Sequence, residues 1–414
     1  MKRYVIIGSG PAGATAAETL RKLDDESRMT VVTAEAYPYY KRERIAGLIS
    51  GDETEESLFE KGKDFYQKIR AELVSRRVTG VSTEKNQLIL DDDSTIDYDS
   101  LLIASGGKPI PLRSQGAELE GISALYTIDD AKRISKLVKE ATNIVVVGGG
   151  TIAMKVVPIF RRIGLKATLV EKADGLWPTA LDKKASEILE SNLREDGAEV
   201  VLNEEIAELQ GKGGRIQSVS LKSQRRLPCD LLLLTTGMRP SVDFLKRSAI
   251  RHDLGVPVDH HMRTNIPNVY AAGDVAQVPD PLLQAPALHP TWDYAEEQGE
   301  IAANNMVGVA TEYEGAVPLF SLGLYDIGVL AAGISQPQAD FEELSAFSPQ
   351  ASSYRRFLLQ RGRLVGVTLI GKGLGTKTLK PQLKKALLKT VDVGASKTDL
   401  LKENFDFSSL LKET

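Results

Sequence analysis

The hydrophobic pattern at the start of the chain predicts a strand, a helix and a second strand. The apolar residues 4–7 run into a glycine-rich turn, small residues dominate positions 12–20, and the apolar run 29–33 leads to Glu35. Short apolar runs bounded by glycine are typical of buried strands, and a stretch of small residues after such a turn favours a helix that packs closely. The order predicts a βαβ unit.

The same order of segments recurs in the middle of the chain. Apolar residues 144–147 lead into a second glycine cluster, a helical stretch follows, and the apolar run 167–170 ends at Glu171. A whole βαβ unit that occurs twice in one chain is hard to obtain by chance. The pattern therefore predicts an α/β protein with two related units.

Both glycine turns carry the dinucleotide-binding fingerprint. Its first glycine makes a tight turn, its second lets the backbone approach a pyrophosphate, and its third lets helix and strand pack closely. The following helix presents free N–H groups and a positive dipole end to the phosphates. Glu35 and Glu171 can each accept a hydrogen bond from a ribose 2′-hydroxyl, and a carboxylate would repel a 2′-phosphate. The sequence therefore favours NADH over NADPH.

Composition indicates a protein with a sizeable core and no need of disulfides. The chain has 414 residues, of which 42% are hydrophobic, and a single cysteine, Cys229. No apolar run reaches the roughly 18 residues that a membrane span needs. The early first strand leaves no room for an export signal, so we expect a cytoplasmic protein. The four histidines have no metal-binding spacing, and we expect no metal.

Several further motifs, in the expected order, resemble the pyridine nucleotide-disulfide oxidoreductase superfamily. The resemblance is to its cysteine-free branch, the NADH:rubredoxin oxidoreductases and ferredoxin reductases. Residues 101–107 resemble the segment that links the family's FAD domain to its NAD domain, and residues 230–240 resemble the return segment. Residues 264–274 are similar to the second FAD signature, whose aspartate holds the flavin ribitol.

The resemblance implies two Rossmann-like domains and a C-terminal α+β domain. The FAD-binding domain would comprise residues 1–112 and 248–315, the NAD-binding domain residues 113–247, and the C-terminal domain residues 316–414. The implied FAD contacts are Gly8, Gly10, Pro11, Ala12, Gly13, Glu35, Arg42, Val78, Ala104, Ser105, Gly106, Gly273, Asp274 and Trp292. The implied NAD contacts are Gly148, Gly150, Thr151, Ile152, Ala153, Glu171 and Gly237.

The second fingerprint departs from the family pattern. Lys155 stands where the family usually has a glutamate near the flavin, and Gly47 stands where a partner lysine is expected. A desolvated ammonium there would stabilise a reduced anionic flavin, so Lys155 is a candidate for flavin tuning; a solvent-facing helix lysine is the alternative. Pro158 falls about two turns into the predicted helix and removes one of its hydrogen bonds.

The C-terminal region predicts a hairpin around residues 361–363 and an amphipathic helix with Leu379, Leu383, Leu387 and Val391 on one face. Residues 354–397 hold eleven lysines and arginines against one acid, in a chain whose net charge is 52 − 56 = −4. This basic region suits docking of a small acidic carrier such as rubredoxin or ferredoxin; a solvated basic face without a partner is the alternative. No motif indicates nucleic acid.

The resemblance implies an FAD-dependent NADH oxidoreductase that passes electrons to such a carrier. Hydride transfer needs no side-chain acid or base, so no catalytic residue is assigned, and Lys155 and Trp292 are the candidates for flavin tuning. Trp292 matches the family tryptophan that lies close to the isoalloxazine, which makes it a candidate exit for electrons. Two alternatives stay open: a flavin-only NADH oxidase that yields peroxide, and a non-catalytic electron-transfer subunit of a larger complex. The oligomeric state is also open, with a homodimer as one option.

Overall fold

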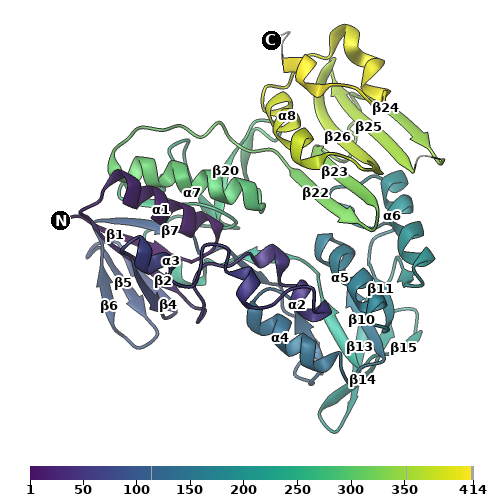
Figure 1. The fold of residues 1–414 in the computed structure, drawn as a ribbon, viewed down its shortest axis with the longest axis horizontal. Helices are drawn as coiled ribbons and strands as arrows, with labels where there is room; N and C mark the ends of the chain where they lie inside the picture. The colour runs from purple at the N-terminus through teal and green to yellow at the C-terminus, as the bar shows by residue number, and fades with distance from the viewer. Residues whose placement is uncertain (113, 351, 412–414) are drawn as a thin grey trace. The chain divides into compact units, whose positions relative to one another are not determined.

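The computed structural model describes residues 1–112, 114–350 and 352–411, and the chain divides into two compact units (Figure 1). Unit 1 comprises Met1–Arg42, Glu56–Lys108 and Met238–Val317. Unit 2 comprises Glu43–Glu55, Pro109–Gly237 and the segment from Pro318 onward. Each unit is described by itself below.

Unit 1 is built on a five-stranded parallel sheet. Its strands, in spatial order, are β19 (Val269–Ala271), β7 (Ser100–Ile103), β1 (Arg3–Ile7), β2 (Arg28–Thr33) and β3 (Glu72–Ser75). The central strands are almost wholly apolar and buried, because helices cover a parallel sheet on its faces. The edge strand β19 joins from far along the chain, so this unit is assembled from segments that are distant in sequence.

Unit 2 contains a second parallel sheet with the same internal order. Its strands are β12 (Glu199–Val201), β11 (Lys166–Val170), β10 (Asn143–Val147), β16 (Leu231–Leu234) and β9 (Ile122–Ala124). The two sheets differ in where one edge strand comes from in the chain: β9 precedes the repeated unit in sequence, whereas β19 follows it. The predicted α/β fold with two Rossmann-like sheets is confirmed.

The repeat extends beyond the fingerprints to the antiparallel strands that interrupt each sheet. Unit 1 carries β4 (Val78–Ser82), β5 (Gln87–Leu90) and β6 (Thr95–Asp97) between its third and fourth parallel strands. Unit 2 carries β13 (Ile206–Lys212), β14 (Arg215–Leu221) and β15 (Arg226–Pro228) at the corresponding place. Unit 1 has a further small sheet, made of β18 (Val256–Pro257), β20 (Ala276–Asp280) and β21 (Ala285–Leu288).

The helices of unit 1 are α1 (Pro11–Leu23), α3 (Phe65–Lys68) and α7 (Trp292–Val307). Figure 1 shows α1 and α7 side by side. Their close approach depends on Gly299, since a Cβ at that position would lie 2.3 Å from the carbonyl oxygen of Ala12. This contact brings the middle of α7 next to the start of α1.

The helices of unit 2 are α2 (Gly47–Ser50), α4 (Ile128–Leu137), α5 (Thr151–Arg162), α6 (Lys183–Glu195) and α8 (Thr376–Leu388). The helix α5 continues through Pro158, as its place in the sequence predicted. Short strands β8 (Gly107–Pro109) and β17 (Met238–Pro240) pair where the chain leaves unit 1 and returns to it. No described helix is both long and apolar enough to cross a membrane.

The C-terminal part of unit 2 is an antiparallel sheet of β22 (Leu319–Leu324), β23 (Ile327–Gly333), β26 (Arg363–Lys372), β25 (Ser353–Gln360) and β24 (Phe341–Ser348). The predicted hairpin joins β25 to β26 through Arg361 and Gly362, both at positive φ as in a tight hairpin turn. Helix α8 contacts this sheet (Figure 1). It ends at Leu388, so the prediction that Val391 continues the helical face is wrong, although Val391 is buried beyond the helix end.

The units are bounded differently from the expected domains. The C-terminal segment packs in the same compact unit as the second parallel sheet, and residues 43–55 belong to that unit too. Arg356 on β25, which is buried, links the C-terminal segment to the second parallel sheet. Its guanidinium donates to Glu343 at 2.9 Å and lies 3.4 Å from Asp182, the N-cap of α6. Arg113, where the NAD-binding domain was expected to begin, lies outside the described residues. The three-domain division stays a prediction.

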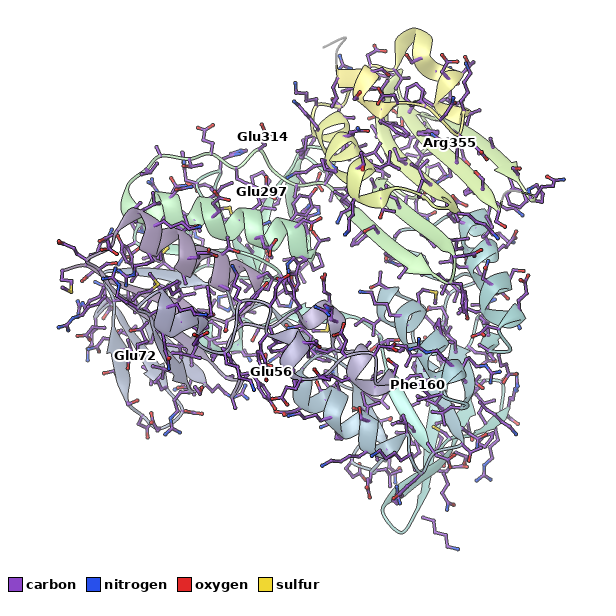
Figure 2. The ribbon with its side chains drawn as sticks, viewed as in Figure 1. Glu56, Glu72, Phe160, Glu297, Glu314 and Arg355 are labelled. Atoms are coloured by element: carbon purple, nitrogen blue, oxygen red, sulfur yellow. The ribbon has the colours of Figure 1, made fainter. Side chains whose placement is uncertain are left out.

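Phe160 on α5 tests how much the core of unit 2 contributes to stability (Figure 2). Its side chain is fully buried, so Phe160→Ala leaves a cavity and should lower the free energy of unfolding by about 3–5 kcal/mol. Urea unfolding followed by circular dichroism measures the change. Phe347→Ala is the matched control, because Phe347 is 42% exposed and its truncation should cost far less. Equal losses in the two variants would contradict the assigned core.

Candidate functional site

The first glycine turn lies between β1 and α1 in unit 1. Gly8 has φ +110°, and a Cβ there would lie 2.0 Å from the carbonyl oxygen of Ala104 at the end of β7. A Cβ on Gly13 would lie 2.0 Å from the carbonyl oxygen of Gly8. Gly10 is the N-cap of α1 and has open space where a Cβ would stand. The turn is closed against the protein on one side and open at the helix N-terminus, as a phosphate cradle must be.

The second glycine turn has the same geometry in unit 2. Gly148 has φ +102°, and its Cβ would lie 2.7 Å from the carbonyl oxygen of Thr235 at the end of β16. Gly150 caps α5 with extended backbone angles close to those of Gly10 and has open space around it. Ala153 replaces the third glycine and is fully buried against the sheet. Both turns therefore fit a dinucleotide pyrophosphate.

Sequence reasoning missed two hydroxyl groups that hold these turns. The Tyr66 hydroxyl lies 2.8 Å from the Ser9 hydroxyl inside the first turn. The Thr235 hydroxyl donates to the carbonyl of Gly148 at 2.7 Å, with the carbonyl of Val147 at 2.9 Å. Tyr66 belongs to none of the motifs, and Thr235 lies in the segment 230–240 without having been singled out; only the folded chain brings the two hydroxyls to the turns.

The carboxylate of Glu35 lies just past the end of β2 and is already hydrogen-bonded. It accepts the Tyr40 hydroxyl at 2.6 Å and the Arg42 guanidinium at 2.6 Å, and the guanidinium also lies 4.8 Å from the Tyr40 ring centre. Each carboxylate oxygen has a second lone pair, so Glu35 can still accept a ribose hydroxyl. The structure thus joins two of the expected FAD contacts, Glu35 and Arg42, directly.

Asp274 follows β19 in the segment that resembles the second FAD signature. Burial raises the pKa of its carboxyl to about 6, and the nearby positive charge of Arg42 opposes that rise. The preceding Gly273, at φ +79°, donates its N–H to Gln298 on α7 at 2.8 Å. A partly buried carboxyl whose pKa is raised suits a group that meets sugar hydroxyls instead of bulk water.

Trp292 begins α7, and its indole N–H donates to Glu296 at 2.8 Å. The ring of Tyr39 lies 6.1 Å away and the Lys41 ammonium lies 4.9 Å above the indole. The remaining expected FAD contacts are also in unit 1. Val78 opens β4, and Ala104, Ser105 and Gly106 follow β7, with the Ser105 hydroxyl donating to the carbonyl of Ser241 at 2.9 Å.

Most of the expected FAD contacts therefore lie at one edge of the first sheet. Apart from Val78 at the start of β4, they come from the segments that follow β1, β2, β7 and β19, four strands that run parallel, together with the first residues of α1 and α7. Ligands of such sheets bind beyond the carboxyl ends of the strands. Segments separated by more than two hundred residues are thus brought to one place by the strand order.

Glu171 holds the corresponding position in unit 2 but is more deeply buried. Its carboxylate accepts the backbone N–H of Gly149 at 2.6 Å and that of Ala173 at 2.9 Å. These two bonds fix the carboxylate over the glycine turn, where it can meet a ribose. Gly237, at φ +105°, lies at the end of the unit 2 segment that precedes β17.

One of the departures from the family pattern, Gly47 on α2, has a structural explanation. A Cβ on Gly47 would lie 2.3 Å from Glu53, whose side chain covers that glycine and accepts two hydrogen bonds from Arg44, each at 2.8 Å. A lysine at position 47 would therefore displace this ion pair. Lys155 is exposed, whereas the flavin-tuning hypothesis requires a desolvated ammonium. The exposure of Lys155 gives the flavin-tuning hypothesis no support, and the hypothesis stays a prediction.

Cys229 has none of the features of a reactive thiol. It is fully buried in a cluster of apolar residues around β14 and β16, and burial raises the pKa of its thiol to about 12. Thiolate, the reactive form, is scarce under such conditions. No group of three potential metal ligands gathers within the part of the chain that the structure describes.

Comparison with known proteins identifies the family. The sequence pattern of the pyridine nucleotide-disulphide oxidoreductases matches residues 2–299, well over half of the chain. The chain therefore belongs to this family of flavin- and pyridine-nucleotide-dependent oxidoreductases, and the resemblance found from its motifs is confirmed.

The curated relatives include parts of larger enzymes. The assimilatory nitrate reductase electron transfer subunit of Bacillus subtilis (strain 168) is 26% identical over 405 residues, which is 97% of this chain and 51% of that protein. The probable ferredoxin reductase CtmF of Castellaniella defragrans is 28% identical over 372 residues, 89% of this chain and 90% of the relative. The chain spans about half the length of the nitrate reductase subunit and of a nitrite reductase from the same Bacillus strain.

Solved structures share the fold over nearly the whole chain. The covalent putidaredoxin reductase–putidaredoxin complex matches with a TM-score of 0.89 at 24% identity, covering 100% of this chain and 98% of that one. The water-forming NADH oxidase from Lactobacillus brevis matches with a TM-score of 0.89 at 20% identity, covering 99% and 95%. At these identities the likeness concerns the fold alone.

The raised pKa of Asp274 predicts a pH-dependent stability difference. Because folding favours the protonated carboxyl, its stabilising contribution is present below about pH 4 and is lost as the pH rises through about 6. In the flavin-free protein, Asp274→Asn should therefore gain stability relative to the unmodified chain between about pH 4 and pH 7, by up to about 3 kcal/mol. Urea unfolding across this pH range measures the difference.

The exposed acid Asp91 supplies the control for this experiment. Asp91→Asn should show no such trend, because its carboxylate is in contact with water. A stability difference for Asp274→Asn that stays constant or shrinks with rising pH would contradict the assignment of a buried carboxyl.

Proposed function

We propose that this chain is an FAD-dependent NADH oxidoreductase that passes electrons through the flavin to a small acidic electron carrier. The observation that carries the proposal is the convergence, in unit 1, of the first glycine turn with the segments around Glu35, Ser105 and Asp274. A second glycine turn with its own carboxylate, Glu171, lies in unit 2. Two nucleotide sites in one chain fit a bound FAD that stays in place and an NADH that exchanges.

In this proposal the first turn holds FAD. The N–H groups at the start of α1 bind the pyrophosphate, Glu35 accepts ribose hydroxyls, and Asp274 binds the ribitol chain. The bound flavin would supply hydride acceptance and one-electron release. The chain's own residues bind and orient the two cofactors, and no side-chain acid or base is required of them.

The second turn holds NADH. The carboxylate of Glu171 is fixed by two backbone N–H groups, so it would place negative charge where NADPH carries its 2′-phosphate. Burial of Glu171 makes that repulsion stronger than at an exposed position. Preference for NADH over NADPH follows from this arrangement.

Electrons would leave on the side of Trp292. The Trp292 indole, at the start of α7, contacts the Tyr39 ring and the Lys41 ammonium. The indole is partly exposed, so it can make contact with a docked carrier. We place the protein in solution in the cytoplasm, with no nucleic-acid partner, and a homodimer through the C-terminal sheet is one option for its assembly.

A second function is favoured by the names of two relatives. Besides the electron transfer subunit of nitrate reductase, the NADH-dependent phenylglyoxylate dehydrogenase subunit epsilon of Aromatoleum evansii is 27% identical over 369 residues. A chain with Lys155 and Gly47 in place of the family's ion pair could serve as such a subunit with a weakened NADH site. A flavin-only NADH oxidase that yields peroxide is the third possibility, since buried Cys229 leaves no thiol chemistry for reducing oxygen to water.

One anaerobic experiment separates these functions. The purified protein should show the visible spectrum of bound flavin, and NADH should bleach it within seconds while NADPH acts far more slowly. Rubredoxin, ferredoxin and oxygen are then offered as acceptors in parallel. A flavin colour that persists after NADH addition supports the subunit, rapid peroxide formation supports the oxidase, and a protein without flavin overturns all three.

Several cations in the basic region 354–397 are buried or paired with acidic residues, so they are not available to a docked carrier. Arg355, labelled in Figure 2, is buried and donates to the carbonyls of Leu400 and Glu403, while Arg356 is paired with Glu343. Lys372 and Lys397 are paired with Asp326 and Glu342. Fewer of the eleven cations are therefore available for docking than the net charge of the region suggests, and docking of the carrier at this region stays a prediction. Among the described residues of this region, the exposed cations without a hydrogen bond or ion pair from their side chains are Arg361, Lys377, Lys385 and Lys389.

We expect the remaining exposed lysines to speed reduction of an acidic carrier through their positive charge. Replacing Lys377, Lys385 and Lys389 together with glutamine should lower kcat/KM for an acidic carrier by about tenfold at low salt and flatten its salt dependence. Reduction of ferricyanide by NADH should not change. The control replaces three exposed lysines elsewhere in unit 2, Lys139, Lys166 and Lys212. Equal effects of both triple changes would exclude this region as the docking surface.

A further inference from the structure

Trp177 lies in the loop between β11 and α6 of unit 2, in a backbone conformation that large residues rarely adopt. Its φ is +49°, and the residue is only 5% exposed. Positive φ strains a residue with a bulky side chain, because its Cβ comes too close to a carbonyl oxygen of the backbone. Such a conformation persists only where the surrounding contacts hold it in place. The contacts of Trp177 therefore determine the course of this loop.

The backbone of Trp177 is bonded to the second glycine turn. Its N–H donates to the carbonyl of Gly149, the middle residue of the turn, at 2.9 Å. The N–H of Gly149 donates to Glu171 at 2.6 Å. Leu176 also lies against this glycine, since a Cβ there would stand 2.9 Å from the leucine side chain. Both polar groups of the Gly149 backbone are thus held by the segment 171–177.

The side chain of Trp177 packs against the C-terminal sheet. Its indole meets the Phe320 ring on β22 edge to face, with the ring centres 5.5 Å apart. The carbonyl of Trp177 accepts the N–H groups of Ala180 and Leu181, both at 3.0 Å, so the chain turns tightly after it. One residue therefore contacts the glycine turn through its backbone and the C-terminal sheet through its ring.

Hydrogen bonds tie the rest of the loop to the same sheet. Just beyond β23, the Ser335 hydroxyl donates to the carbonyl of Thr179 at 3.0 Å. The side-chain amide of Gln336 donates to the carbonyl of Pro178 at 3.2 Å. The position of the loop is therefore set by the C-terminal sheet, and Trp177 connects that loop to the glycine turn.

We propose that Trp177 is a positioning residue that fixes the second glycine turn for its nucleotide and makes this fit depend on the C-terminal sheet. The inference rests on the proposed function, because it takes the second turn as the NADH site. Glycine would adopt the same φ without strain but would lack the ring that contacts Phe320. A pyrophosphate needs backbone N–H groups that are already in place, so a looser loop should weaken nucleotide binding and leave hydride transfer unaltered.

Amide hydrogen exchange of the purified full-length protein, without added nucleotide, tests the positioning. In Trp177→Ala the peptide that contains Gly149 should exchange about tenfold faster, because the loop loses its anchor on the sheet. Trp177→Phe should keep exchange slow, since a phenylalanine ring can still pack on Phe320. The peptide that contains Gly10, in unit 1, should not change in either variant.

Phe320→Ala tests the connection to the sheet without changing the loop. Exchange at Gly149 should again rise, and titration with NAD⁺ should show binding about fivefold weaker. With ferricyanide as acceptor, KM for NADH should rise while kcat stays unchanged. Phe341→Ala is the matched control, because Phe341 is also partly buried but lies on β24, at the opposite edge of the same sheet. It should change none of these quantities.

The two measurements separate this proposal from the proposed function. Unchanged exchange at Gly149 in Phe320→Ala would overturn the proposal even if Trp177→Ala fails to fold. Faster exchange with unaltered NAD⁺ affinity would overturn it as well. If the unmodified protein binds neither NAD⁺ nor NADH but exchange at Gly149 still rises in the variants, the NADH site is contradicted and the hold of Trp177 on the turn stands.

Discussion

Backbone packed directly on backbone is the contact on which this structure depends. At Gly8 and at Gly148 the chain passes so close to the end of a neighbouring strand that a Cβ would overlap a carbonyl oxygen. Only glycine allows this approach, and positive φ at both residues turns the chain from strand into helix. The helix N-termini are thereby left open beyond the sheet edge. The proposed pyrophosphate contacts in each unit are arranged around one of these two openings.

Other close contacts extend the same constraint through unit 1. Gly299 lets α7 pack on α1, and Gly273 turns the chain so that its N–H reaches Gln298. These contacts bring Asp274 and Trp292 to the edge where the first glycine turn lies. The carboxyl of Asp274 then becomes buried enough to raise its pKa, which a turn residue in water would not show. The chemistry of the site is thus a consequence of helix packing.

Ion pairing determines what the charged residues are free to do. Arg355 and Arg356 are adjacent on β25 and contribute to the positive charge of the region, yet both are buried and hydrogen-bonded. Arg44 and Glu53 likewise neutralise each other above Gly47. Lys155 remains exposed beside this pair. The lysine that departs from the family pattern on α5 therefore stays at the surface of the helix.

The sequence alone determined the repeated βαβ units, the glycine turns, Glu35 and Glu171, and the family, because these depend on local spacing and on residues with few conformational alternatives. It also placed the hairpin at residues 361–363, because a short segment with a glycine between two apolar runs favours a turn. Only the tertiary structure decided which charges are neutralised, that residues 43–55 pack with the second sheet, and that Tyr66 and Thr235 hold the turns. These features depend on contacts between residues far apart in the chain, and no local pattern records such contacts.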